Sequence, residues 1–332
     1  MHPAALASLT AMLLVLPACP SHPGRVAATG SSSVYPITEA IAEVLSALHP
    51  GVQVTVDIAG TGGGFQKLCA GETDLAGASR PIKQSELAQC RRSNVPFVEL
   101  PIAYDAIAVV ANPKNGWASD LSVAELKRLW QPAAQGRVTR WSQVRTGWPD
   151  VPIHLFGPGA ASGTYDAFTE AILGAERSSR TDYAATADPN LTATGVAAEV
   201  GALGFFSLAY HRENEDKLKL IGIDAGAGPV LPTTEAVQSG AYRPLSRLLF
   251  LYASARSLER PEVATFLDVA LQRAPALVAR LGYLPLPQRA YDLAKERAHR
   301  RWAGSLFAGQ GLHDSARAAG LLEAATADEE PR

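Results

Sequence analysis

The chain has 332 residues, of which 47% are hydrophobic, so it can bury enough core for two lobes of ordinary domain size. Its 30 basic residues nearly balance its 32 acidic residues, and the net charge is -2. This balance argues against the strongly basic surface of a nucleic-acid-binding protein. A buried site for a small anion stays open, because it needs only local positive charge.

The first residues predict export from the cytoplasm. Residues 1–18 hold an apolar run that is too short to span a bilayer and is followed by small residues, as in a signal peptide. Residues 16–19 resemble the cleavage box of bacterial lipoproteins, whose cysteine carries the lipid. We therefore expect a lipid anchor on Cys19 and a polar linker over residues 19–25. An ordinary signal peptide that contains a cysteine is the alternative.

Two cysteines remain after Cys19, at Cys69 and Cys90. Disulfides persist outside the cytoplasm, and an even remainder predicts one bond between this pair. A metal site is the weaker interpretation, because the two cysteines lack the usual paired ligand spacing and no histidine lies near either.

Three turns rich in Ser, Thr and Gly each follow a predicted strand and precede a predicted helix. They comprise residues 31–33, 59–64 and 157–164. The first turn of a helix offers free N–H groups and partial positive charge, and nearby hydroxyls complete a socket for an anion. Plain helix capping explains any one of these turns. The repetition of the same device three times favours a ligand site.

Arg80 and Asp105 are charged residues next to or within predicted apolar strands, where a charge suggests a partner or a ligand. Arg80 follows the short strand predicted over residues 74–78, and a guanidinium there can pair with a tetrahedral oxyanion. A surface arginine is the alternative. Asp105 interrupts the long apolar strand predicted over residues 101–112, where an acid is either paired or part of a site. A second apolar strand, over residues 245–252, can return the chain beside the first one.

These two long strands predict two crossings between two lobes with a cleft between them. We expect residues 26–108 to form the first part of lobe 1 and residues 109–245 to form lobe 2. Residues 246–308 then return to lobe 1 and end in helices. The composition of residues 309–332 predicts a weakly ordered tail.

Six short motifs occur in order at residues 30–40, 69–82, 157–164, 201–206, 244–247 and 282–287. In this order they resemble the periplasmic phosphate-binding proteins of bacterial ABC phosphate importers, above all the cyanobacterial branch. The similarity runs from about residue 28 to about residue 306. It implies an α/β fold of the type II periplasmic binding proteins, in which each lobe is a mixed sheet flanked by helices and the ligand lies between the lobes.

The resemblance also implies a ligand set and a biological role. The implied phosphate contacts are Ser32, Ser33, Val34 through its backbone, Thr61, Ser79, Arg80, Ser162, Gly163 and Thr164. The family implies a monomeric binding protein, not an enzyme, that needs no cofactor or metal. It would deliver phosphate to ABC permease subunits in the inner membrane, and it would touch the membrane only through its lipid anchor in the periplasm.

One departure concerns the acid that accepts the proton of hydrogen phosphate in many family members. The matching positions carry Ser79, Pro158, Ala160 and Ala161, none of which is acidic. We expect Asp105 or Asp166 to take this role, or else discrimination against sulfate to be weaker. Sulfate has no proton to give, so an acceptor rejects it.

Two other functions use the same residues. A phosphatase or serine hydrolase could use Ser162, but residues 159–163 lack the Gly-x-Ser-x-Gly spacing of a nucleophile elbow. The histidines are scattered and form no His-Glu-x-x-His pair. An oxyanion sensor with the same site is the other alternative.

Overall fold

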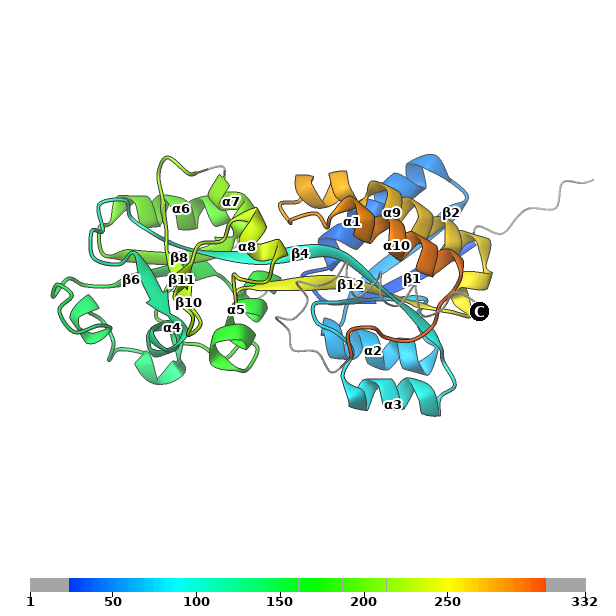
Figure 1. Cartoon of the computed structure of the whole chain (residues 1–332), viewed down its shortest axis with the longest axis horizontal. Helices are drawn as coiled ribbons and strands as arrows, with labels where there is room; N and C mark the ends of the chain where they lie inside the picture. The colour runs from blue at the N-terminus through cyan, green and yellow to red at the C-terminus, as the bar shows by residue number, and fades with distance from the viewer. Residues whose placement is uncertain (1–23, 161, 187, 213, 309–332) are drawn as a thin grey trace, which may run out of the picture.

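The computed structural model describes residues 24–160, 162–186, 188–212 and 214–308. Two lobes lie side by side, and the long strands β4 (Phe97–Ala111) and β12 (Ser246–Ser254) join them (Figure 1). The predicted signal peptide, Cys19 and the tail from residue 309 lie outside the described residues. Within the described part of the chain, no helix is long and apolar enough to cross a membrane.

The first lobe is built on the strand order β2-β1-β3-β12-β4. The strands β1, β2 and β3 are parallel, and β12 is antiparallel to both of its neighbours. Helices and strands alternate along its N-terminal half, as expected for parallel pairing. Besides β4 and β12, the lobe contains β1 (Gly24–Gly30), α1 (Tyr35–Leu48), β2 (Val52–Ile58), α2 (Gly60–Ala70), β3 (Leu75–Ala78), α3 (Gln84–Arg92), η3 (Ser257–Glu259), α9 (Pro261–Arg280) and α10 (Gln288–His299).

The second lobe continues the same sheet as β4-β8-β6-β7, with β9 also paired to β4. A small separate sheet has the order β11-β10-β5. The elements of this lobe are β5 (Asp120–Ser122), α4 (Val123–Trp130), η1 (Pro132–Ala134), η2 (Trp141–Gln143), β6 (His154–Pro158), α5 (Gly163–Leu173), β7 (Ala184–Thr186), α6 (Pro189–Ala198), β8 (Ala202–Ser207), α7 (Leu208–Arg212), β9 (Lys219–Leu220), β10 (Gly222–Asp224), β11 (Pro229–Val230) and α8 (Thr234–Gln238).

The strand β4 changes partners along its length. Residues 97–106 pair with β12, and residues 107–111 pair with β8. All of β4 is buried, which explains its nearly continuous apolar sequence, since a strand covered on both faces carries few polar residues. The register places Arg247 of β12 opposite Asp105 of β4. Asp105 and Arg247, one charged residue from each long strand, are therefore neighbours.

The predicted disulfide is present and joins α2 to α3 through Cys69 and Cys90. Both residues are buried, and they lie 21 positions apart in the sequence. We expect a variant with serine at both positions to lose about 3 kcal/mol of unfolding free energy, because the open loop gains entropy in the unfolded chain. Urea denaturation of the two proteins measures this difference, and equal midpoints and slopes would contradict the prediction.

Candidate functional site

A cavity of about 290 Å³ lies between the lobes. The residues before α1 contribute Ser32 and Ser33, and the start of α5 contributes Ser162, Gly163 and Thr164. The strand β4 contributes Asp105. The structure thus brings together predicted site residues from two turns that are far apart in the sequence. The remaining wall consists of Pro36, Pro158, Thr186, Pro189, Thr192, Phe206, Ser207, Tyr210, Leu281 and Tyr283.

The turn before α1 is compact because β1 ends in a glycine. Gly30 has a φ of 138°, and a Cβ atom there would lie 2.1 Å from the carbonyl oxygen of Gly77. The Ser33 N–H donates to Oγ of Ser31 at 3.2 Å, and the Val34 N–H donates to the Ser31 carbonyl at 3.0 Å. The Val34 side chain is fully buried in the core. The turn therefore presents Ser32 and Ser33 to the cavity while Val34 anchors it.

The turn before α5 meets the first turn directly. Ser162 is the N-cap, and its Oγ accepts a hydrogen bond from the Thr164 N–H at 3.2 Å, which confirms the predicted helix start. The Ser33 hydroxyl donates to the Gly163 carbonyl at 3.3 Å across the two lobes. A Cβ atom at Gly163 would lie 2.7 Å from Oγ of Ser33. Glycine at this position therefore allows the two turns to touch.

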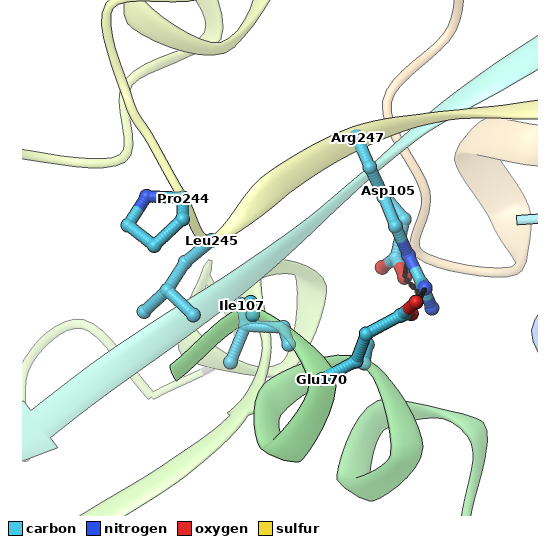
Figure 2. A pocket seen from close by; sticks show the side chains of 8 residues that line it. Asp105, Ile107, Glu170, Pro244, Leu245 and Arg247 are labelled. Carbon is cyan, nitrogen blue, oxygen red and sulfur yellow. Dashed lines mark hydrogen bonds and ion pairs between the residues drawn. The ribbon is translucent and has the colours of Figure 1, made fainter. Parts of the chain in front are cut away.

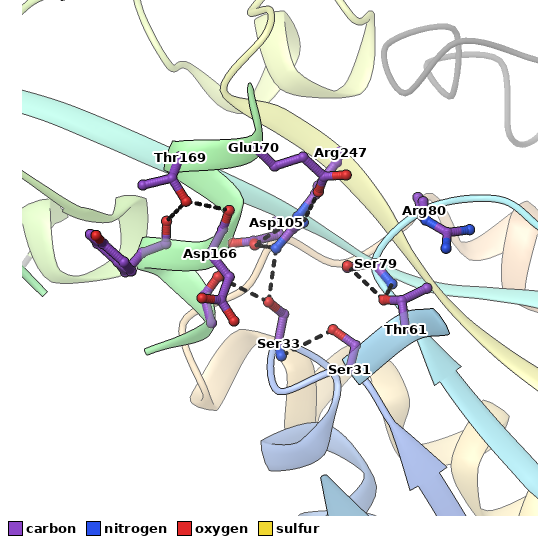
Figure 3. Close-up of polar contacts among 12 residues, drawn as sticks. Ser31, Ser33, Thr61, Ser79, Arg80, Asp105, Asp166, Thr169, Glu170 and Arg247 are labelled. Atoms are coloured by element: carbon purple, nitrogen blue, oxygen red, sulfur yellow. Dashed lines mark hydrogen bonds and ion pairs between the residues drawn. The ribbon is translucent and has the colours of Figure 1, made fainter. Parts of the chain in front are cut away.

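A buried arginine that sequence reasoning missed connects both lobes at this point. The Nη2 group of Arg247 donates to Oγ of Ser33 at 2.8 Å, and both Nε and Nη2 lie 3.3 Å from Oδ2 of Asp105. Its Nη1 atom lies 3.9 Å from Oε2 of Glu170 on α5. Figures 2 and 3 show this guanidinium between the two carboxylates. The side chain of Arg247 is 11% exposed. It does not itself line the cavity of about 290 Å³, but it contacts Ser33 and Asp105, which do, and it lines a small adjoining pocket with Asp105 and Glu170.

The turn before α2, over residues 59–64, does not reach the cavity, unlike the turns before α1 and α5. Thr61 and Ser79 are buried, and their hydroxyls form a hydrogen bond of 3.0 Å with each other. Arg80 donates two hydrogen bonds to Glu86, at 2.9 and 2.8 Å, and lies over the Phe65 ring. None of the three predicted residues from this region lines the cavity, and Figure 3 shows Arg80 pointing away from Ser33.

The Arg80 guanidinium lies away from the cavity because it is paired with the Glu86 carboxylate of α3. Glu86 is the third residue of α3, where it also accepts a hydrogen bond from the Lys83 N–H. Burial lowers the pKa of Arg80, but the hydrogen bond and the charge of Glu86 outweigh burial, and the pKa is raised. The structure therefore does not bring Arg80 to the cavity as its fixed cation.

The two candidate proton acceptors are also separated by the structure. Asp105 is buried, lines the cavity and contacts Arg247. Among the described residues, the hydrogen bonds to its carboxylate use Oδ2, so Oδ1 is left for a ligand. Asp166 does not line the cavity, and its two oxygens accept from Arg177 at 3.0 and 3.2 Å. Only Asp105 of this pair can meet a ligand in the cavity.

The charges around Arg247 are mostly negative. Asp105 and Glu170 contact it, and Glu176 lies in the same acidic cluster. Burial raises the pKa of the Glu176 carboxyl, and repulsion by Glu170 and Asp166 adds to this effect. An anion that brings a proton is favoured in such surroundings, because the proton can bridge to a carboxylate.

The Tyr283 side chain holds the turn before α1 in place through a hydrogen bond to its backbone. Burial raises the pKa of Tyr283, and the charge of Asp105 adds to this shift, so the hydroxyl stays protonated. It donates to the Ser33 carbonyl at 2.9 Å. Tyr283 thereby fixes the backbone that holds the Ser33 hydroxyl toward Arg247.

Metal ligands and histidines do not cluster at the cavity in the described part of the chain. Among the described residues, no cluster of three or more histidine, cysteine, aspartate or glutamate side chains could hold a metal ion. The described lining of the cavity contains no histidine. His154 forms an ion pair with Glu199 near the surface instead. The Oγ atom of Ser162 is used as a helix cap.

Residues 18–273 match a family model described as the PBP superfamily domain. The chain belongs to the PBP superfamily. The chain is 46% identical to protein SphX of Synechocystis over 306 residues, which cover 91% of each of the two chains. It is 34% identical to phosphate-binding protein PstS of Staphylococcus haemolyticus over 272 residues, or 81% of this chain and 83% of the relative.

A solved structure of this kind supports the same conclusion. The crystal structure of a possible phosphate-binding protein from Planctomyces limnophilus matches with a TM-score of 0.80 and 43% identity. The match covers 84% of this chain and 99% of that one. The resemblance to phosphate-binding proteins and the two-lobed α/β fold predicted from the sequence are both confirmed.

Proposed function

We propose that this protein binds inorganic phosphate in the cavity between its lobes and delivers it to an ABC importer. One observation carries the proposal: the hydroxyl-rich starts of α1 and α5 meet at one cavity beside the Arg247 guanidinium. Relatives named as phosphate-binding proteins support the choice of ligand.

Each part of the site replaces a part of the hydration shell of phosphate. The first turn of α5 supplies backbone N–H groups and partial positive charge. At the start of α1 the Ser33, Val34 and Tyr35 N–H groups already donate to Ser31, so this turn contributes hydroxyls and helix charge. Ser32 and Ser162 supply hydroxyls that can donate to phosphate oxygens, whereas the Ser33 hydroxyl donates to the Gly163 carbonyl and accepts from Arg247. Arg247 supplies the full positive charge from directly behind Ser33 and Asp105, which line the cavity, and its planar guanidinium suits a tetrahedral oxyanion. In this proposal Arg247 takes the role that the sequence suggested for Arg80.

Asp105 gives the site its choice of anion. Its carboxylate can only accept hydrogen bonds, so it favours an anion that carries a proton. Hydrogen phosphate carries one and sulfate does not. The proposal therefore assigns Asp105, rather than Asp166, as the proton acceptor that replaces the acids missing at Ser79, Pro158, Ala160 and Ala161.

The cellular setting follows from the same proposal. A protein with a signal peptide and a lipid on Cys19 would act in the periplasm or cell envelope and present its loaded, closed form to permease subunits. A sensor with the same site would instead bind a signalling partner. Affinity purification from phosphate-starved cells separates the two, because a transport protein is expected to recover permease subunits.

The ligand can be tested on the protein as purified. We expect native mass spectrometry to show one bound phosphate that is lost on denaturation. Calorimetric titration of the phosphate-stripped protein is then expected to give one site per chain. A protein that carries no phosphate and gives no binding heat with it would contradict the proposal.

A further inference from the structure

The guanidinium of Arg247 is held more loosely than that of Arg80. Its Nε and Nη2 atoms both lie 3.3 Å from Oδ2 of Asp105, whereas charge-assisted hydrogen bonds are usually about 2.7–2.9 Å long. Arg80 meets that standard, because it reaches the Glu86 carboxylate at 2.9 and 2.8 Å. The Arg247 guanidinium is therefore not locked onto Asp105 and can shift between partners.

A second carboxylate, that of Glu170, contacts this guanidinium (Figure 2). Glu170 belongs to α5 and follows Gly163, at the start of the same helix, by about two turns. Its Oε2 atom lies 3.9 Å from Nη1 of Arg247, which is close enough for an ion pair but too far for a hydrogen bond. Among the described residues, the hydrogen bonds of Arg247 use Nε and Nη2, so Nη1 stays available to Glu170.

The structure leaves room for the guanidinium to move toward Glu170. A pocket of about 20 Å³ adjoins the larger cavity, and Asp105, Glu170 and Arg247 line it. A space of about 10–15 Å³ admits one water molecule, so this pocket also admits a small displacement of the side chain. The guanidinium is one rigid planar group, so a closer contact of Nη1 with Glu170 changes the contacts of Nη2 with Ser33 and Asp105.

The surroundings of this pocket strengthen the attraction between its charges. The rest of its wall is apolar and consists of Ile107, Ala167, Ala171, Pro244 and Leu245. Charges interact more strongly beside such a wall than in water, because the local dielectric constant is lower. Glu170 is 24% exposed and Arg247 is 11% exposed, so water screens their attraction only in part.

We propose that Glu170 competes with phosphate for the Arg247 guanidinium and thereby weakens binding and speeds release. The inference rests on the proposed function, because it concerns the same anion and the same cation. Two carboxylates already share one guanidinium, so a bound anion is the third negative group that it serves. A protein that hands its ligand to a permease must also release it, and a carboxylate that takes over the guanidinium makes this step easier.

Replacing Glu170 with glutamine tests the competition, because the amide keeps the shape of the side chain and removes its charge. We expect Glu170→Gln to bind phosphate at least about fivefold more tightly than wild type in calorimetric titration of the phosphate-stripped protein. The gain is expected to appear as slower release, measured by stopped-flow mixing of loaded protein with an excess of a fluorescent phosphate reporter. A merely structural ion pair predicts the opposite sign, since its loss weakens binding.

Three further variants support the interpretation. Glu170→Ala is expected to show the same gain, so a folding defect in one variant does not decide the result. Glu176→Gln removes the same charge from the acidic cluster, but Glu176 forms no ion pair with Arg247 among the described residues, so we expect its affinity to stay within about twofold of wild type. Adding Glu170→Gln to Arg247→Gln is expected to improve binding no more than about twofold, because the contested guanidinium is already gone.

The outcomes separate this inference from the function on which it rests. Unchanged or weaker binding in both folded Glu170 variants would overturn the inference and leave phosphate binding intact. An equal gain in Glu176→Gln, or a full gain in the Arg247→Gln background, would also overturn it, because the effect would then come from net charge and not from competition for Arg247. Absence of phosphate binding in the wild-type protein would overturn the proposed function itself.

Discussion

Replacing Arg247 with glutamine is expected to weaken phosphate binding at least about 100-fold. Charge-assisted hydrogen bonds contribute about 1.5–3 kcal/mol each, and about 1.4 kcal/mol corresponds to a tenfold change in affinity. The substitution also leaves the carboxylates of Asp105, which lines the cavity, and Glu170, which lies behind it, without a cation between them. Calorimetric titration of phosphate-stripped protein measures the change, and thermal unfolding checks that the variant is folded.

Two further variants define the role of this guanidinium. Arg247→Lys keeps the charge but loses the planar fork, so we expect a loss of about tenfold. Arg80→Gln is the matched control, because Arg80 donates to Glu86 outside the cavity, and its affinity is expected to stay within about threefold of wild type. Normal affinity in Arg247→Gln together with a large loss in Arg80→Gln would assign the charge to Arg80 instead.

Replacing Asp105 with asparagine is expected to reduce the preference for phosphate over sulfate at least about 100-fold. In the wild-type protein, an oxygen of sulfate would face a carboxylate oxygen with no proton between them, and such an unpaired buried contact is costly. The asparagine amide can donate to sulfate, so the variant accepts both anions. Parallel titrations with phosphate and sulfate give the ratio of the two affinities for each protein.

Asp166→Asn is the control for this experiment, because Asp166 is paired with Arg177 and does not line the cavity. We expect it to leave the affinity ratio unchanged, although the loss of the ion pair can lower stability. Equal affinities of the wild-type protein for phosphate and sulfate would show that Asp105 does not discriminate between them. A changed ratio in Asp166→Asn alone would give the role to that residue.

Local sequence patterns determined much of the fold. Apolar runs placed β4 and β12 within a few residues of their observed limits, since buried strands have a recognisable composition. The serine before α5 marked that helix start through its capping chemistry. The cysteine count gave the disulfide. The small sheet of β5, β10 and β11 was not predicted, because strands of two or three residues are too short to show a period.

Ser33 and Ser162 could be nominated from the sequence because each stands in a turn at a helix start, and helix starts are local features. The choice among the charged groups was decided only by the tertiary structure. Arg247 and Asp105 meet because β12 and β4 pair in one register, and Arg80 is withdrawn because α3 brings Glu86 to it. The Arg247–Asp105 contact joins residues that are distant in the chain, and the Arg80–Glu86 contact joins residues on either side of a turn. Their energies depend on burial and geometry, which a pattern along the sequence does not contain.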